Sequence, residues 1–237
     1  MKRILLLFIT VFIISCDAGT LQQVVDAVNS TTVTNADISQ GLKQALTKGI
    51  DSGVSYLSKP DGFYKSPYKI LLPENARKVT DKLKVVPGFN KLESEINLKL
   101  NRAAEDAVKR AKPIFVDAIK QMTFNDVRNI LMGNRNAATQ YLHRTTYNKL
   151  YNEFHPVIIK SLNKYGALDL WANAVNNYNK IPFVEKMNPK LDDYVTKKAL
   201  VGVFDMVEKK EYDIRTNIKS RSTDLLKKVF ALQDKKK

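Results

Sequence analysis

Apolar residues that recur at steps of three and four constrain the fold of this chain more than any other feature. One helix face is marked by Ile38, Leu42, Ala45, Leu46, Ile50, Val54 and Leu57. The same spacing returns in most segments up to Phe230, and no run alternates between apolar and polar residues as a half-buried strand does. The sequence therefore predicts an all-α fold, with a single bundle of roughly seven to nine helices in residues 38–232.

Prolines and polar residues mark the expected ends of these helices. Pro60-Asp61-Gly62 has the composition of a turn, and Pro73 suits the first turn of a helix. Residues 90–121 predict one long helix, in which Pro113 introduces a kink or break near Lys112. Four polar residues are predicted to cap helix N-termini, and they are Asp37, Thr123 (in a capping box with Asp126), Asp192 and Thr223.

Further irregularities are expected inside the helical pattern. Residues 64–72 are the stretch that best suits an extended conformation. A second long helix, over residues 137–165, contains Pro156, so an irregularity is predicted at His155-Pro156. Three glycines four or eight residues apart predict a helix that another backbone approaches closely, with a small-molecule groove as the alternative; they are Gly41, Gly49 and Gly53.

The first residues have the composition of a secretory signal. Lys2 and Arg3 precede an apolar stretch that is shorter than the ~20 residues needed to span a bilayer as a helix. Residues 1–15 are therefore a predicted signal peptide. The ending Ile13-Ile14-Ser15-Cys16 resembles the lipobox of bacterial lipoproteins, which implies a diacylglycerol group and acyl chains such as palmitate on Cys16. The alternative is an ordinary signal peptide that ends near Ser15 or Ala18.

The charge of the chain bears on its partners. It carries 39 lysines and arginines against 24 aspartates and glutamates, a formal charge of +15. Residues 16–37 are predicted to be a lipidated tether, and residues 233–237 a basic tail. A basic surface attracts polyanions, so an exported, anchored protein is expected to meet anionic lipid or an acidic envelope polymer rather than nucleic acid. A protein partner is a further prediction, and a solvated surface without a partner is the alternative.

Motifs that name a reaction are absent from the sequence. His143 and His155 would lie ~18 Å apart on a straight helix and cannot share a metal ion. There is no Gly-x-Ser-x-Gly elbow, no Gly-rich phosphate loop and no Cys/His cluster. The sequence therefore predicts no metal site, no cofactor and no catalytic residue.

One polar cluster stands out as a candidate ligand site. Asn101 and Glu105 share a helix face, and Arg102 lies three residues before Glu105. Together with Asp193 from another helix, these residues are the candidates for ligand binding, or for an enzyme site if they converge in a pocket. The structural alternative is an ion-pair network that holds helices in register. Asp193 precedes Lys197 by four residues, which predicts a helix ion pair.

Six ordered segments between Ile38 and Phe230 resemble the bacterial family of domain of unknown function 4197. They are residues 59–63, 101–105, 118–123, 137–139, 191–200 and 223–230. Asn217-Ile218-Lys219-Ser220 departs from the proline-containing turn expected in that family, which puts the geometry of that loop in question. The resemblance implies an exported, often lipidated helical protein, and it implies no activity and no site residues.

These features predict a membrane-anchored envelope lipoprotein that binds an envelope component or a partner protein. Its lipid anchor would hold it to the inner or outer membrane of a bacterium, with the helical domain facing the periplasm. The alternatives are an enzyme with a polar site at Asn101, Arg102, Glu105 and Asp193, and a structural envelope protein that works as an oligomer.

Overall fold

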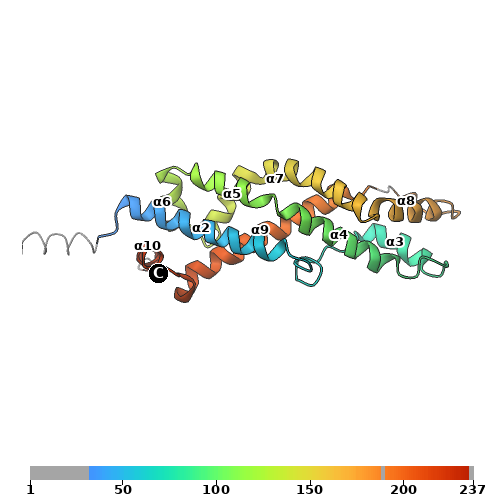
Figure 1. Ribbon diagram of the computed structural model, residues 1–237, viewed down its shortest axis with the longest axis horizontal. Helices are drawn as coiled ribbons and strands as arrows, with labels where there is room; N and C mark the ends of the chain where they lie inside the picture. The colour runs from blue at the N-terminus through green and yellow to red at the C-terminus, as the bar shows by residue number, and fades with distance from the viewer. Residues whose placement is uncertain (1–31, 188–189, 235–237) are drawn as a thin grey trace, which may run out of the picture. The chain divides into compact units, whose positions relative to one another are not determined.

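The computed structural model describes residues 32–187 and 190–234. Within these ranges the chain forms α-helices and one short 3-10 helix, and no strand, so the all-α prediction is confirmed (Figure 1). The number of α-helices in the described part agrees with the predicted range. The predicted signal peptide, Cys16 and most of the predicted tether lie outside the described residues.

The chain divides into two units, Met1–Thr34 and Asn35–Lys237, and the described helices belong to the second. In chain order these elements are α2 (Asn35–Leu57), α3 (Glu74–Leu83), α4 (Leu92–Val108), α5 (Ala111–Lys120), α6 (Phe124–Met132), α7 (Ala137–Lys164), α8 (Ala167–Tyr178), α9 (Asp192–Thr216), η1 (Ile218–Ser220) and α10 (Asp224–Asp234).

Helix α9 organises the core of this unit. It packs against α7, α2 and α4 (Figure 1). Residues four apart lie along one side of a helix, so a row of them can face the core together. On α9 the row of buried residues begins with Val195, Ala199, Val203 and Val207. It continues into two buried charged residues, Glu211 and Arg215.

Helix α2 approaches its neighbours closely through its glycines. A Cβ atom at Gly41 would lie 2.7 Å from Cγ2 of Val229 on α10. A Cβ atom at Gly53 would lie 2.9 Å from Cγ of Met206 on α9. Because such separations are too short for real Cβ contacts, neighbouring helices approach α2 closely at these glycines, as predicted. The atoms that fill the space belong to the side chains of Val229 and Met206, so the expectation of a close backbone was wrong.

The long helix predicted for residues 90–121 is two helices, because Pro113 breaks it. Helix α4 ends at Val108 and α5 begins at Ala111. The break falls at Lys109, slightly before the predicted position near Lys112. Lys109 is four residues before Pro113, which has no N–H for that carbonyl and whose ring crowds it.

The prediction of a helix irregularity at His155-Pro156 was wrong, since α7 runs unbroken through Pro156. Asn152, whose carbonyl loses its usual partner, is exposed, as is Pro156. Water can therefore bond to the carbonyl of Asn152, and the helix continues at modest cost.

Side-chain capping follows the sequence at two of four helix starts. The prediction for Asp37 was wrong, since α2 begins at Asn35 and Asp37 lies in its first turn. Thr123 and Asp126 form the predicted capping box of α6, and the hydroxyl of Thr223 accepts a hydrogen bond from the backbone N–H of Leu226 at 3.3 Å. At α9 the cap prediction was wrong, since Leu191 occupies the N-cap position and Asp192 is the first helical residue. Asp192 instead contacts His155 Nε2 at 2.8 Å, so an interhelical partner outcompetes the local cap.

A buried ion pair on α9 joins the end of α6 to the start of α7. Arg215 donates to the carbonyls of Ile130 and Leu131 at 2.8 and 3.1 Å, in the last turn of α6. Glu211 accepts from the backbone N–H groups of Ala138 and Thr139 at 2.9 and 2.8 Å, in the first turn of α7. These are the groups that a helix leaves unpaired at its ends, and each charge has the sign that the adjacent helix dipole favours.

The ion pair also closes on itself. Arg215 Nη2 lies 2.7 Å from Glu211 Oε1, and their side chains are 1% and 2% exposed. A charge removed from water in this way must be fully paired, or it costs stability. Every bond described above therefore depends on both residues being present.

We predict that Arg215→Met lowers the free energy of unfolding by about 3–5 kcal/mol, because it leaves the Glu211 carboxylate buried without its counter-charge. Urea denaturation followed by circular dichroism measures this change. Arg128→Met is the matched control, because Arg128 is exposed on α6, and its effect should stay within about 0.5 kcal/mol. Equal effects of the two substitutions would contradict a structural role for the pair.

Candidate functional site

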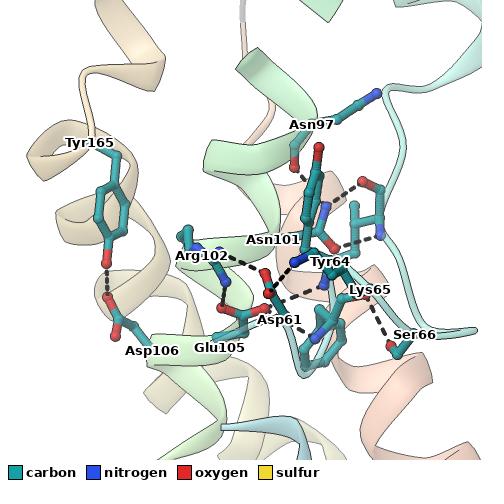
Figure 2. A network of polar contacts seen from close by, with 12 residues as sticks. Asp61, Tyr64, Lys65, Ser66, Asn97, Asn101, Arg102, Glu105, Asp106 and Tyr165 are labelled. Atoms are coloured by element: carbon teal, nitrogen blue, oxygen red, sulfur yellow. Dashed lines mark hydrogen bonds and ion pairs between the residues drawn. The ribbon is translucent and has the colours of Figure 1, made fainter. Parts of the chain in front are cut away.

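Two asparagine amides of α4 hold the extended segment that precedes α3. Asn101 accepts from the N–H of Ile70 at 2.8 Å and donates to the carbonyl of Ile70 at 2.7 Å (Figure 2). Asn97 accepts from the N–H of Leu72 at 2.8 Å. Both amides are buried, and they supply the partners that a neighbouring strand would offer. Residues 69–72 form neither helix nor turn and belong to no sheet, whereas residues 64–68 form turns. The extended conformation predicted for residues 64–72 is therefore wrong for the first part of that stretch.

The carboxylate of Glu105 holds the turn at residues 60–64. Glu105 is 3% exposed, and its Oε1 accepts from the N–H groups of Phe63 and Tyr64 at 3.1 and 3.3 Å. Its Oε2 lies 2.7 Å from Arg102, which also reaches Asp61 at 2.7 Å (Figure 2). The hydrogen bond that Arg102 donates to the Glu105 carboxylate is the main cause of the raised pKa of Arg102. The charged groups of Glu105 and Arg102 are therefore occupied in holding the turn against α4.

Next along α4, Asp106 binds the end of α7. It accepts hydrogen bonds from Tyr165 at 3.1 Å (Figure 2) and from Ser161 at 3.0 Å, and it pairs with Lys109 at 2.8 Å. Burial by itself would raise the pKa of Asp106, but the contacts with Lys109, Ser161 and Tyr165 outweigh burial and lower the pKa below its ordinary value.

The predicted site residues fall into two groups. Asn101, Arg102 and Glu105 lie in one network, as their helical spacing indicated. Asp193 instead accepts from Tyr151 at 2.7 Å and forms the predicted ion pair with Lys197 at 2.9 Å. The pKa of Asp193 is lowered, first by Lys197 and then by Tyr151.

The segment held by α4 forms one wall of a basic pocket, and α9 forms the opposite wall. We use "basic pocket" for this cavity of about 480 Å³, whose lining comprises Pro67, Tyr68, Lys69, Ile70, Leu71, Arg77, Tyr194, Lys198, Val201, Gly202, Asp205 and Lys209. Gly202 lets the two walls meet, since a Cβ atom there would lie 2.9 Å from the ring of Phe63. The lining holds four cationic side chains and one carboxylate.

Aromatic rings and hydrogen bonds orient the cations of the basic pocket. Lys209 donates to the hydroxyl of Tyr68 at 3.0 Å and pairs with Asp205 at 2.9 Å. Lys198 lies over the ring of Tyr194, 5.7 Å from its centroid. An aromatic ring attracts a cation without neutralising it, so the charge of Lys198 stays available to a ligand, whereas Asp205 balances the charge of Lys209.

Both tyrosines are themselves held in place. The hydroxyl of Tyr194 donates to the carbonyl of Leu71 at 2.9 Å, which ties α9 to the extended segment. Burial is the main cause of the raised pKa of Tyr68 and of Tyr194, so both phenols stay neutral hydrogen-bonding groups at physiological pH.

Sequence reasoning missed the basic pocket. It identified the positive charge of the chain, but Lys69 and Arg77 lie more than a hundred residues from Lys198 and Lys209. The spacing of residues along the chain carries no signal of this convergence.

The histidines do not form a metal site. His143 stacks with Phe204 at 4.6 Å between ring centroids, and His155 contacts Asp192. No group of three or more potential metal ligands occurs in residues 32–187 and 190–234. Among the helices of these ranges, none has the length and apolar character required to cross a membrane.

Comparisons with known proteins give one match. A family model described as "Protein of unknown function (DUF4197)" matches residues 32–231. No curated protein and no solved structure matches the chain.

The lowered pKa of Asp106 predicts a pH-dependent contribution to stability. A carboxylate whose pKa falls on folding stabilises the protein above its ordinary value of 3.8, and this contribution is lost as the pH falls through the folded-state pKa. We expect Asp106→Asn to lower the free energy of unfolding at pH 7, and the difference from the wild type to shrink as the pH falls below 4.

Urea denaturation at a series of pH values checks this expectation. Asp213→Asn is the control, because Asp213 is exposed, and it should leave the stability nearly unchanged at each pH. A difference for Asp106→Asn that stays constant across the acid range would contradict the role given to the charge.

Proposed function

The chain belongs to the DUF4197 family, and we propose that it is a binding module whose basic pocket takes an anionic group of a bacterial cell-envelope component. The observation that carries this proposal is the excess of cations in the lining of one cavity, which contains Lys69, Arg77, Lys198 and Lys209 but a single carboxylate, Asp205. Because Lys209 already pairs with Asp205, the remaining cations are the ones offered to a ligand.

The composition of the pocket fits a phosphate or a similar oxyanion. Arg77 donates through Nε to the carbonyl of Leu72 at 3.3 Å. This hydrogen bond fixes the guanidinium beside the end of the extended segment. A fixed guanidinium recognises oxyanions well, because it can donate two parallel hydrogen bonds. Lys198 supplies a second charge from the opposite wall. Lipid headgroups and acidic polymers of the envelope share this anionic chemistry.

We place this binding module at a membrane on the evidence of the first sixteen residues. A signal peptide over residues 1–15 and an acylated Cys16 would tether the helical domain to the inner or outer membrane, facing the periplasm. A lipid anchor would keep the basic pocket close to anionic headgroups, where each cation gains attraction to the surface. In this role the anchor holds the domain at the membrane and the pocket binds an anionic group there.

Substitution of pocket cations tests the ligand class. We expect Lys198→Gln and Arg77→Gln each to weaken binding of inorganic tripolyphosphate by roughly tenfold or more, because each removes a charge-assisted hydrogen bond. Isothermal titration calorimetry at low ionic strength measures the affinity. A second titration uses vesicles of phosphatidylcholine with phosphatidylglycerol. If the pocket takes a lipid headgroup, the same substitutions should also weaken vesicle binding, whereas a pocket for a free polyanion should show the loss with tripolyphosphate alone.

Lys160→Gln is the matched control, because Lys160 is an exposed lysine on α7 outside the pocket. Its affinity for tripolyphosphate should equal that of the wild type. If Lys160→Gln weakens binding as much as Lys198→Gln does, the attraction comes from the overall charge and the pocket has no special role.

Substitution of Cys16 tests the anchor. We expect the wild-type protein to fractionate with membranes and its intact mass to show cleavage before Cys16 and added acyl groups. Cys16→Ala removes the thiol that accepts the diacylglycerol, so this variant should carry no acyl mass and should leave the membrane fraction. An unmodified wild-type mass would refute the anchor.

A further inference from the structure

Two proline-containing turns expose apolar side chains after α3 and α8. Val85 and Val86 follow α3 and are 81% and 39% exposed. Phe183 follows α8 and is fully exposed, at 108% of its reference area. The helices α3 and α8 pack against each other, and the turns that follow them lie at the same end of the helical unit (Figure 1). We use "apolar tip" for Val85, Val86, Pro87, Pro182 and Phe183.

The turn that carries Phe183 is held in an outward conformation. Asn179 accepts from the N–H of Met187 at 2.9 Å and donates to its carbonyl at 3.1 Å, which closes the loop at its base. Phe183 has a φ of 61°, a value that costs energy for a bulky side chain. A strained aromatic residue that points into water on a closed loop is unusual, and such strain is typically retained where it serves a function.

Lysines surround the apolar tip. Residues 82–91 contain Lys82, Lys84 and Lys91 and no acidic residue. In residues 180–187, Lys180 and Lys186 accompany Glu185, whose carboxylate lies 3.6 Å from Lys78 of α3. The combination of exposed apolar side chains with flanking cations is the one that favours an anionic bilayer surface, because the apolar groups enter the acyl boundary while the lysines reach the headgroups.

We propose that the apolar tip inserts into the interfacial region of an anionic membrane. The tip consists of two protruding turns, which a deformable lipid surface accommodates without matching their shape. This inference goes beyond the proposed function, since it concerns a surface separate from the basic pocket and needs none of the pocket residues.

A fluorescent residue at position 183 tests the insertion. In Phe183→Trp, we expect the tryptophan emission to shift to the blue and to be quenched by brominated acyl chains in vesicles of phosphatidylcholine with phosphatidylglycerol. Ile218→Trp is the control, because Ile218 is 64% exposed in η1, and its emission should not be quenched. Trp171, which is 1% exposed, contributes the same background to both variants.

Quenching by brominated acyl chains reports only on a tryptophan that lies within the lipid. Attachment of the full chain through its N-terminal segment therefore does not by itself quench a tryptophan at position 183. Lys84→Gln and Lys180→Gln, each combined with Phe183→Trp, should raise the lipid concentration for half-maximal quenching by roughly fivefold. Lys160→Gln, combined with Phe183→Trp, should leave quenching unchanged, because Lys160 is an exposed residue of α7 outside both the apolar tip and the basic pocket. Phe183→Trp by itself should leave the affinity for tripolyphosphate unchanged, which separates this result from the outcome for the basic pocket. An unquenched Phe183→Trp on vesicle-bound protein, or equal quenching in pure phosphatidylcholine, would overturn the proposal.

Discussion

The buried pair of Glu211 and Arg215 is the interaction on which the arrangement of the helices depends. It places a negative charge on the first turn of α7 and a positive charge on the last turn of α6, both from the side of α9. Helix ends that are buried must find partners for their free backbone groups, and this pair supplies them for two helices at once. The end of α6 and the start of α7 are thereby held against α9, the central helix of the unit.

The same physical solution recurs where the chain has no secondary structure. Asn97, Asn101 and Glu105, on successive turns of α4, bind backbone groups between Phe63 and Leu72. A segment without a strand partner would otherwise bury unpaired amides, which is costly. Because its backbone is bonded in this way, the segment is rigid enough to serve as a wall of the basic pocket.

This arrangement gives the polar cluster of α4 a positioning role. Its charged atoms point toward the turn and the segment that they hold (Figure 2), while Arg77, Lys198 and Lys209 line the pocket that this segment forms with α9. The pocket and the apolar tip are then two separate surfaces of one helical unit. In the proposed role, one takes an anionic group and the other meets the lipid, and both suit a protein tethered at its N-terminus.

The sequence by itself determined the class of the fold, most of the helices, two of the four predicted helix caps and the close packing at the glycines of α2. These features are local, since they depend on residues within one or two turns of each other.

The sequence also identified Asn101, Arg102 and Glu105 as a cluster, and left open whether they bind a ligand or hold the fold. Only the tertiary structure decided that they bind the backbone between Phe63 and Ile70, that Asp192 pairs with His155 instead of capping α9, and that Lys69, Arg77, Lys198 and Lys209 share a cavity. Contacts between residues a hundred positions apart arise from helix packing, which the spacing of residues along the chain does not encode.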